Sequence, residues 1–157
     1  MPLSSYCKPK AVLPDLEVSD KDDAIRQLVG ALVTARVLKK TVAADVLDEI
    51  LAREGQATTG IGHGVGIPHA RSEHVDKIVM AFGRVDEGVD FGAVDGERVR
   101  VIVMLISPKA KNDEHLAAMK AIVKIVRDPY QCKRLHGCRT PESFMDLIGE
   151  LDGTPAK

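Results

Sequence analysis

Tryptophan is absent from this 157-residue sequence and all aromatic residues together make up 3%, so the core has to be aliphatic. No apolar run approaches the roughly 20 residues that a membrane-spanning helix needs, and the N-terminus lacks the basic and apolar layout of a signal peptide. The net charge of −1 gives no electrostatic basis for binding nucleic acid or an anionic membrane. Cys7, Cys132 and Cys138 are an odd, scattered set that suits a reducing compartment better than a disulfide framework. We therefore expect a cytoplasmic protein without membrane insertion.

The composition, 45% apolar and 29% charged, is that of one globular domain over residues 1–157. Apolar periodicity predicts helices at 21–37, from 41 to just before Gly55, from Asn112 or Asp113 to 127, and after Asp128-Pro129 and Thr140-Pro141. It predicts strands at 11–13, 77–85, 89–91 and 99–107. Side-chain caps of these helices are expected from Ser19 (paired with Asp22), Thr41, Asn112 or Asp113, Asp128 and Thr140. Helices at both ends and strands in the middle indicate an α/β fold with a mixed sheet.

Residues 60–71 read Gly-Ile-Gly-His-Gly-Val-Gly-Ile-Pro-His-Ala-Arg. Glycine at every second position leaves one side of the backbone bare. If the segment is extended, the residues between the glycines all point to the opposite side. Pro68 fixes its own φ and biases Ile67 away from helical conformation, so that the backbone leading to His69 is conformationally restricted. This segment is suited to presenting a reactive imidazole.

Two other kinds of site fit the segment less well. A P-loop needs a Gly-Lys-Ser/Thr ending, and a dinucleotide fingerprint needs a preceding strand and a following helix; neither context is present. The histidines that could gather around zinc are His63, His69, His74 and His115. No pair of them has i, i+4 spacing with an acidic partner on a predicted helix, and no Cys-x-x-Cys occurs. We expect no metal and no cofactor.

His69 is the candidate nucleophile, because imidazole keeps a neutral nitrogen available at cell pH. A phosphoryl group on that nitrogen brings about −1.5 to −2 charges and needs cationic and N–H donors around it. Arg53 ends the helix before the glycine segment, and His115 begins a later helix. Backbone N–H groups of the glycine segment are further donors. The structural alternative is that His69 ends a strand, Arg53 pairs with a carboxylate and His115 serves its helix terminus.

Three motifs follow one another along the chain: Arg53-Glu54 with Thr59 to His69, then Val-Asp-Phe-Gly-Ala-Val-Asp-Gly at 89–96, then Asp-Glu-His-Leu at 113–116. In this order they resemble the fructose/mannitol-type (type 2) enzyme IIA domains of the bacterial phosphotransferase system, which include the nitrogen-regulatory IIA proteins. The resemblance covers about residues 11–150. It implies a mixed sheet sandwiched between helices, with the site at the edge of the sheet.

By this resemblance, His69 would be phosphorylated by a phosphohistidine carrier protein of the HPr/NPr-like type. His115 would stabilise the phosphoryl group, and Arg53 would be the cation of the family pattern. Two positions depart from that pattern: His63 stands where asparagine is usual, and Gly66 where alanine is common. We expect His63 and Gly64 to contribute phosphate contacts through side chain or backbone, and His74 to be a solvated loop residue.

The resulting hypothesis is a IIA phosphocarrier in a regulatory, nitrogen-type role, because the 157 residues contain no fused permease segment. One alternative is a sugar-specific IIA component that passes phosphate to a fructose/mannitol-type permease IIB domain. Another is a regulatory binding module that is not phosphorylated. The sequence does not identify the final acceptor.

Overall fold

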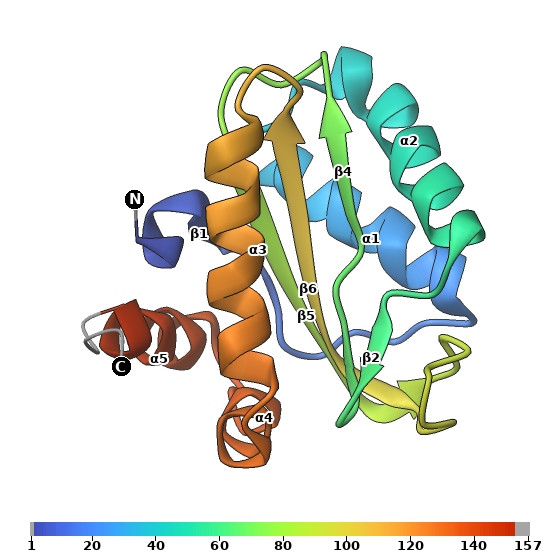
Figure 1. The fold of residues 1–157 in the computed structure, drawn as a ribbon, viewed down its shortest axis with the longest axis vertical. Coiled ribbons are helices and arrows are strands. Elements are labelled where there is room, and N and C mark those ends of the chain that lie inside the picture. The colour runs from blue at the N-terminus through green and yellow to red at the C-terminus, as the bar shows by residue number, and fades with distance from the viewer. Residues whose placement is uncertain (1, 153–157) are drawn as a thin grey trace.

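The sheet is built around the apolar run that the sequence predicts as a strand covered on both faces (Figure 1). In the computed structural model, which describes residues 2–152, the strands are β1 (Cys7–Leu13), β2 (Gly60–Gly62), β3 (Val65–Gly66), β4 (His69–Ser72), β5 (Val79–Val89) and β6 (Val99–Pro108). Their order is β1-β5-β6-β3-β2, and β4 also pairs with β6. Every residue of β6 except Arg100 is buried. Parallel β1–β5, β3–β6 and β4–β6 pairs combine with antiparallel β2–β3 and β5–β6 pairs, so the sheet is mixed as predicted.

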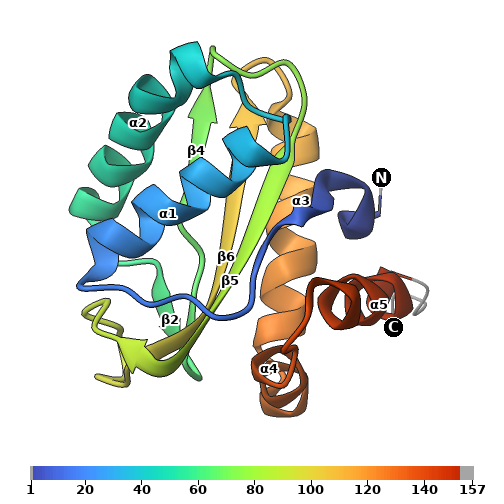
Figure 2. The ribbon, with the colours of Figure 1, turned by 180° about the vertical axis from the view of Figure 1, so that it is seen from behind.

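Helices cover both faces of the sheet, which confirms the predicted fold class. They are α1 (Lys21–Thr34), α2 (Ala43–Gln56), α3 (Asn112–Val126), α4 (Pro129–His136) and α5 (Pro141–Asp152), with short 3₁₀ turns at Leu3–Tyr6 and Lys40–Val42. Helix α3 crosses one face (Figure 1), and α1 crosses the other with α2 beside it (Figure 2). Among residues 2–152, no helix combines the length and the apolarity needed to cross a membrane.

Several predicted element ends are wrong by a few residues. Helix α1 ends at Thr34 because Arg36 adopts a left-handed φ of 62° and the next two N–H groups bond to Leu32. Its N-terminal cap is Asp20, whose carboxylate accepts from the Asp23 N–H. This is one residue after Ser19, the cap predicted to pair with Asp22. Strand β5 extends to Val89, which pairs with Val99 after a bulge, so a separate strand at 89–91 does not form.

The other predicted caps divide into two that form and two that do not. Asp128 accepts from the Tyr130 N–H and Thr140 accepts from the Ser143 N–H, as Asp-Pro and Thr-Pro helix starts predict. Thr41 lies in a 3₁₀ turn and does not cap α2, which runs on through Gly55 to Gln56. Helix α3 begins at Asn112 without a side-chain cap, so neither Asn112 nor Asp113 has that role.

Candidate functional site

The glycine-proline segment holds His69 at the edge of the sheet. The Ile67 N–H donates to the Thr59 carbonyl at 3.0 Å, and the Leu105 N–H donates to the Pro68 carbonyl at 3.0 Å. These two bonds join the segment to the residue before β2 on one side and to β6 on the other. His69 is then the first residue of β4, in register with Leu105. The side chain of His69 is half-buried, and hydrogen bonds of the two preceding residues, Ile67 and Pro68, fix the backbone that carries it.

The ring of His69 is oriented by its own segment. Nδ1 lies 2.8 Å from the carbonyl oxygen of Ile67. A carbonyl oxygen only accepts hydrogen bonds, so Nδ1 carries the proton and donates it. In the neutral ring this leaves Nε2 with the lone pair. Nε2 is therefore the nitrogen that can act as a nucleophile.

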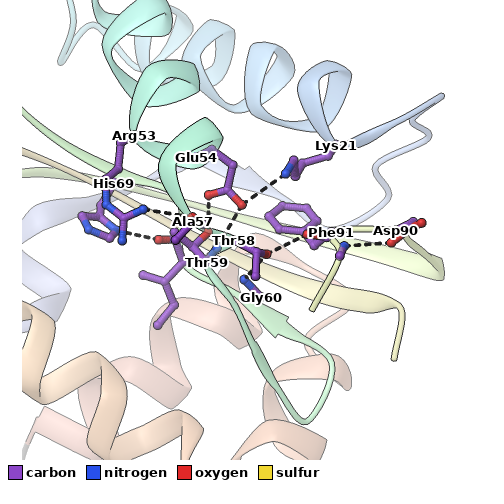
Figure 3. Close-up of polar contacts among 12 residues, drawn as sticks. Lys21, Arg53, Glu54, Ala57, Thr58, Thr59, Gly60, His69, Asp90 and Phe91 are labelled. Atoms are coloured by element: carbon purple, nitrogen blue, oxygen red, sulfur yellow. Dashed lines mark hydrogen bonds and ion pairs between the residues drawn. The ribbon is translucent and has the colours of Figure 1, made fainter. Parts of the chain in front are cut away.

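Arg53 comes to His69 from the last turn of α2 (Figure 3). One guanidinium N–H donates to the Ala57 carbonyl at 3.0 Å, which caps the helix end. The adjacent Glu54 is buried, and its carboxylate accepts from the Thr59 N–H at 3.0 Å and from the Thr59 hydroxyl at 2.6 Å. Lys21 lies 3.5 Å from the same carboxylate. This network fixes the α2–β2 connection, so that Arg53 and His69 keep their relative positions.

His115 approaches from the first turn of α3. Its ring centroid is 5.9 Å from that of His69, with the planes inclined at 41°. Nδ1 of His115 lies 2.7 Å from the hydroxyl oxygen of Ser107, a fully buried residue of β6. The His115 side chain is largely buried as well. The second imidazole is therefore as firmly placed as the first.

These three side chains line one open pocket of about 640 Å³, together with Glu49, Arg71 and Lys109. Three cationic side chains and one carboxylate therefore surround two imidazoles. The carboxylate of Glu49 accepts a hydrogen bond from the Ser72 hydroxyl at 2.7 Å. Among the described residues, Arg53 has no carboxylate in ion-pair range. The pocket is thus suited to a dianionic group, because the excess of positive charge can offset it.

Both imidazoles are held in the neutral form near pH 7. Burial lowers the pKa of His69, and the charge of Arg53 lowers it further, against the opposing effect of the hydrogen bond to Ile67. Burial also lowers the pKa of His115, and the neighbouring His69 and Arg71 add to that effect. A neutral His69 has the free lone pair that nucleophilic attack requires.

The sequence matches an established family over nearly its whole length. The family described as "Phosphoenolpyruvate-dependent sugar phosphotransferase system, EIIA 2" matches residues 5–150. The chain belongs to this family. The "Nitrogen regulatory protein" of Bradyrhizobium diazoefficiens is 31% identical over 156 residues, which are 99% of this chain and 100% of that protein. The "PTS system fructose-specific EIIA component" of Haloferax volcanii is 34% identical over 131 residues, 83% of this chain and 84% of that protein.

Solved structures share the fold of this EIIA 2 domain. The nitrogen regulatory protein IIA-Ntr of Neisseria meningitidis superposes with a TM-score of 0.81 at 26% identity, over 93% of this chain and 98% of that chain. Enzyme IIAMTL of Escherichia coli, solved in complex with phosphorylated enzyme IIBMTL, superposes with a TM-score of 0.76 at 19% identity, over 92% of this chain and 99% of that chain.

The structure separates His63 and Gly64 from the His69 pocket. The segment is not one continuous extended run: β2 and β3 form an antiparallel hairpin whose two turn residues are His63, with φ 56°, and Gly64, with φ 75°. Positive φ at both central residues is what a type I′ turn requires. The Gly64 carbonyl accepts hydrogen bonds from the N–H groups of Arg100 and Val101 in β6, whereas His69 is in register with Leu105. At about 3.3 Å per strand residue, the turn lies roughly 15 Å along β6 from His69.

This hairpin explains the departure of the EIIA 2 domain from its family pattern at position 63. Asparagine and histidine both tolerate the left-handed conformation better than most residues. The exchange of one for the other is therefore compatible with the turn, which lies away from the His69 pocket. His74 is an exposed loop residue, as predicted, with its Nε2 3.9 Å from Asp45.

Four residues at the site of the EIIA 2 domain were not predicted from the sequence: Glu49, Arg71 and Lys109, which line the pocket, and Ser107, which contacts Nδ1 of His115. The position of Arg71 could have been found, because residues 69 and 71 of one strand share a face. Glu49 lies one turn before Arg53 on the same helix. The β4–β6 pairing, which no local pattern specifies, brings Lys109 to the pocket and Ser107 to His115.

Proposed function

We propose that His69 of this phosphotransferase-system IIA domain accepts a phosphoryl group on Nε2 from a phosphohistidine carrier protein of the HPr or NPr type. The observation that carries the proposal is the Nδ1 contact to the Ile67 carbonyl, which leaves Nε2 free beside Arg53 and His115. The lone pair of Nε2 forms a new N–P bond while the N–P bond of the donor breaks. The electrons of that bond return to the donor imidazole, which leaves as a neutral ring because its other nitrogen carries a proton. The proton on Nδ1 of His69 stays on that nitrogen, hydrogen-bonded to the Ile67 carbonyl.

The surrounding groups would catalyse the transfer by position and charge. Arg53 presents a planar guanidinium to the equatorial oxygens, where charge is spread in the transition state. His115 can donate one hydrogen bond from Nε2 while Ser107 holds Nδ1. Arg71 and Lys109 add positive charge at the rim. Arg53 and His115 are already held by hydrogen bonds to Ala57 and Ser107, and such preorganisation is the condition for electrostatic stabilisation.

Phosphorylation from labelled phosphoenolpyruvate, enzyme I and a carrier protein tests the nucleophile. We expect one phosphate per chain, labile in acid and stable in base. Nitrogen-15 NMR should show that its phosphorus is bonded to Nε2. The His69→Ala variant should take up none, and His74→Ala, on an exposed loop, should take up the normal amount. Labelling of His69→Ala at the normal level would disprove the assignment.

The role of the phosphoryl group is proposed to be regulatory, because a nitrogen regulatory protein aligns over the full length of the chain. The charge added at His69 would then change the affinity for a target protein. The similarity to a fructose-specific EIIA component supports a second role, transfer to a IIB domain. Captures with His69→Asp and His69→Ala baits separate the two roles: a regulator should retain different partners on the two baits, and a transport component should instead pass label to an added IIB domain.

A further inference from the structure

A second pocket, which we call the turn pocket, lies between the β2–β3 turn, the start of β6 and helix α4, at the end of the sheet away from His69. Its volume is about 530 Å³. The side chains that give it charge or an imidazole ring are His63, Arg100, Lys133 and His136. No carboxylate of the described residues lines it. It is therefore a basic cavity that the proposed phosphoryl transfer does not use.

The carboxylates that adjoin the lining residues are each hydrogen-bonded. Asp95 accepts from the His63 N–H at 3.2 Å, and Asp128 accepts from the Tyr130 N–H at 3.0 Å. Asp86 accepts from a guanidinium N–H of Arg84 at 2.7 Å, and Arg84 is only 1% exposed. Arg100 donates to the main-chain carbonyl of Asp86 and not to its carboxylate. The Arg84–Asp86 pair is locally neutral, so the charges of Arg100 and Lys133 are left to the pocket.

His136 contributes a nitrogen that has no partner. Its Nε2 is buried and, among the described residues, is the one buried side-chain nitrogen or oxygen without a hydrogen bond. The main-chain carbonyl of the same residue accepts from Arg84 at 2.5 Å, which fixes its position at the end of α4. Burial lowers the pKa of His136, and the guanidinium groups of Arg84 and Arg100 lower it further. Buried polar atoms are nearly always paired, so the His136 ring at the wall of this pocket has hydrogen-bonding capacity that the described residues leave unused.

We propose that the turn pocket binds a small phosphate monoester. Arg100 and Lys133 match the charge of its phosphate, and the imidazoles of His63 and His136 add hydrogen-bond donors. The cavity is larger than a phosphate group alone requires, and Tyr130, a residue that is 64% exposed, offers an aromatic ring for contact with an organic portion. The phosphate contacts that the sequence analysis expected from His63 and Gly64 are thereby assigned to this pocket and not to His69.

Titration of nitrogen-15-labelled protein, followed by NMR, tests the proposal. The probes are inorganic phosphate, fructose 1-phosphate and AMP, which separate the phosphate group from a sugar or nucleoside portion. We expect saturable shifts of the Gly64 amide and the His136 ring with at least one of the two esters, at lower concentration than with inorganic phosphate. Lys133→Gln and Arg100→Gln should each weaken this binding about tenfold, as the loss of one charge-assisted hydrogen bond predicts.

Two controls isolate the turn pocket. Lys10→Gln, an equal charge change at an exposed position on β1, should leave the affinity unchanged. His69→Ala should also bind normally, so that failure of the phosphoryl-transfer proposal would not affect this result. The proposal is overturned if the shifts are confined to His69 and His115, if Lys133→Gln and Arg100→Gln both bind like the wild type, or if neither ester shifts the Gly64 amide at about 10 mM, a concentration that would reveal millimolar affinity.

Discussion

Ser107 and His115 are joined by a contact of 2.7 Å between Oγ and Nδ1, beneath the pocket that holds His69. A neutral imidazole has one N–H. If Nε2 of His115 is to donate to a phosphoryl group, Nδ1 must accept, and the hydroxyl of Ser107 must donate. Ser107 is fully buried, so no solvent can replace it. The tautomer of the second histidine therefore depends on a serine that is the next-to-last residue of the buried strand β6.

Ser107→Ala should slow phosphoryl transfer to His69 while leaving the protein folded. One misplaced hydrogen bond of about 1.4 kcal/mol corresponds to roughly a tenfold loss of rate. Rapid-quench measurement of the labelled protein gives the rate, and circular dichroism gives the fold. Ser107→Thr keeps a hydroxyl and should restore most of the rate. An unchanged rate in Ser107→Ala would show that His115 does not need this donor.

The titration of His69 should respond to Arg53. Burial and the guanidinium together lower the pKa of His69 below its ordinary 6.5, so its ring should take up a proton only in more acidic solution. Removal of the charge in Arg53→Gln should raise the pKa toward the ordinary value, as measured by NMR of the ring protons. Arg26→Gln, on the exposed face of α1, is the matched control and should not move it. A lower pKa in Arg53→Gln would contradict the electrostatic account of the pocket.

Acid should destabilise the protein before carboxylates titrate. The pKa values of His69, His115 and His136 are all lowered by burial. The unfolded chain therefore binds more protons than the native one between the native values and 6.5, and stability rises with pH over that window. The free energy of unfolding in urea should be fully developed above pH 6.5 and decrease as the pH falls through the native pKa values. His115→Gln should make this acid-induced loss of unfolding free energy smaller. An unchanged loss would show that the lowered pKa of His115 does not contribute to it.

The class of fold and the central strand of the sheet follow from patterns that a sequence displays directly. The uninterrupted run around Ile102 predicts a doubly covered strand, and Asp128-Pro129 predicts a helix start; both form as expected. The hairpin at His63 was not predicted because alternating glycines suit an extended strand as well as a turn with positive φ. Ser107 could not be assigned to the site, since its closeness to His115 arises from the helix α3 folding back over β6. Local chemistry identified the two histidines, whereas pairing between distant strands supplied their partners.

The left-handed turn should govern substitutions at position 63. His63→Asn should leave stability unchanged or slightly higher, because asparagine readily adopts this conformation. His63→Val should cost about 1–2 kcal/mol, the penalty of a left-handed residue with a branched side chain. Urea unfolding of the two variants measures the difference. Equal stabilities for valine and asparagine would show that the β2–β3 turn relaxes at no cost.

Gly66 should tolerate alanine only if the ring packed on it can move. A Cβ at this position would lie 2.8 Å from Cε2 and 3.0 Å from Cδ2 of Phe91, whose side chain is 1% exposed. Overpacking of this kind costs about 1–3 kcal/mol, so Gly66→Ala should lower the free energy of unfolding even though alanine is common here in the family pattern.

A double-mutant cycle with Phe91→Leu locates the cause. If the ring is the obstacle, Gly66→Ala should cost less in the Phe91→Leu background, with a coupling energy of about 0.5–3 kcal/mol for residues in contact. Gly30→Ala is the matched control: it lies in α1 with nothing within 4 Å of the added Cβ, and should stabilise the protein. Additive losses in the cycle would place the strain of alanine in the β3 backbone and not in its contact with Phe91.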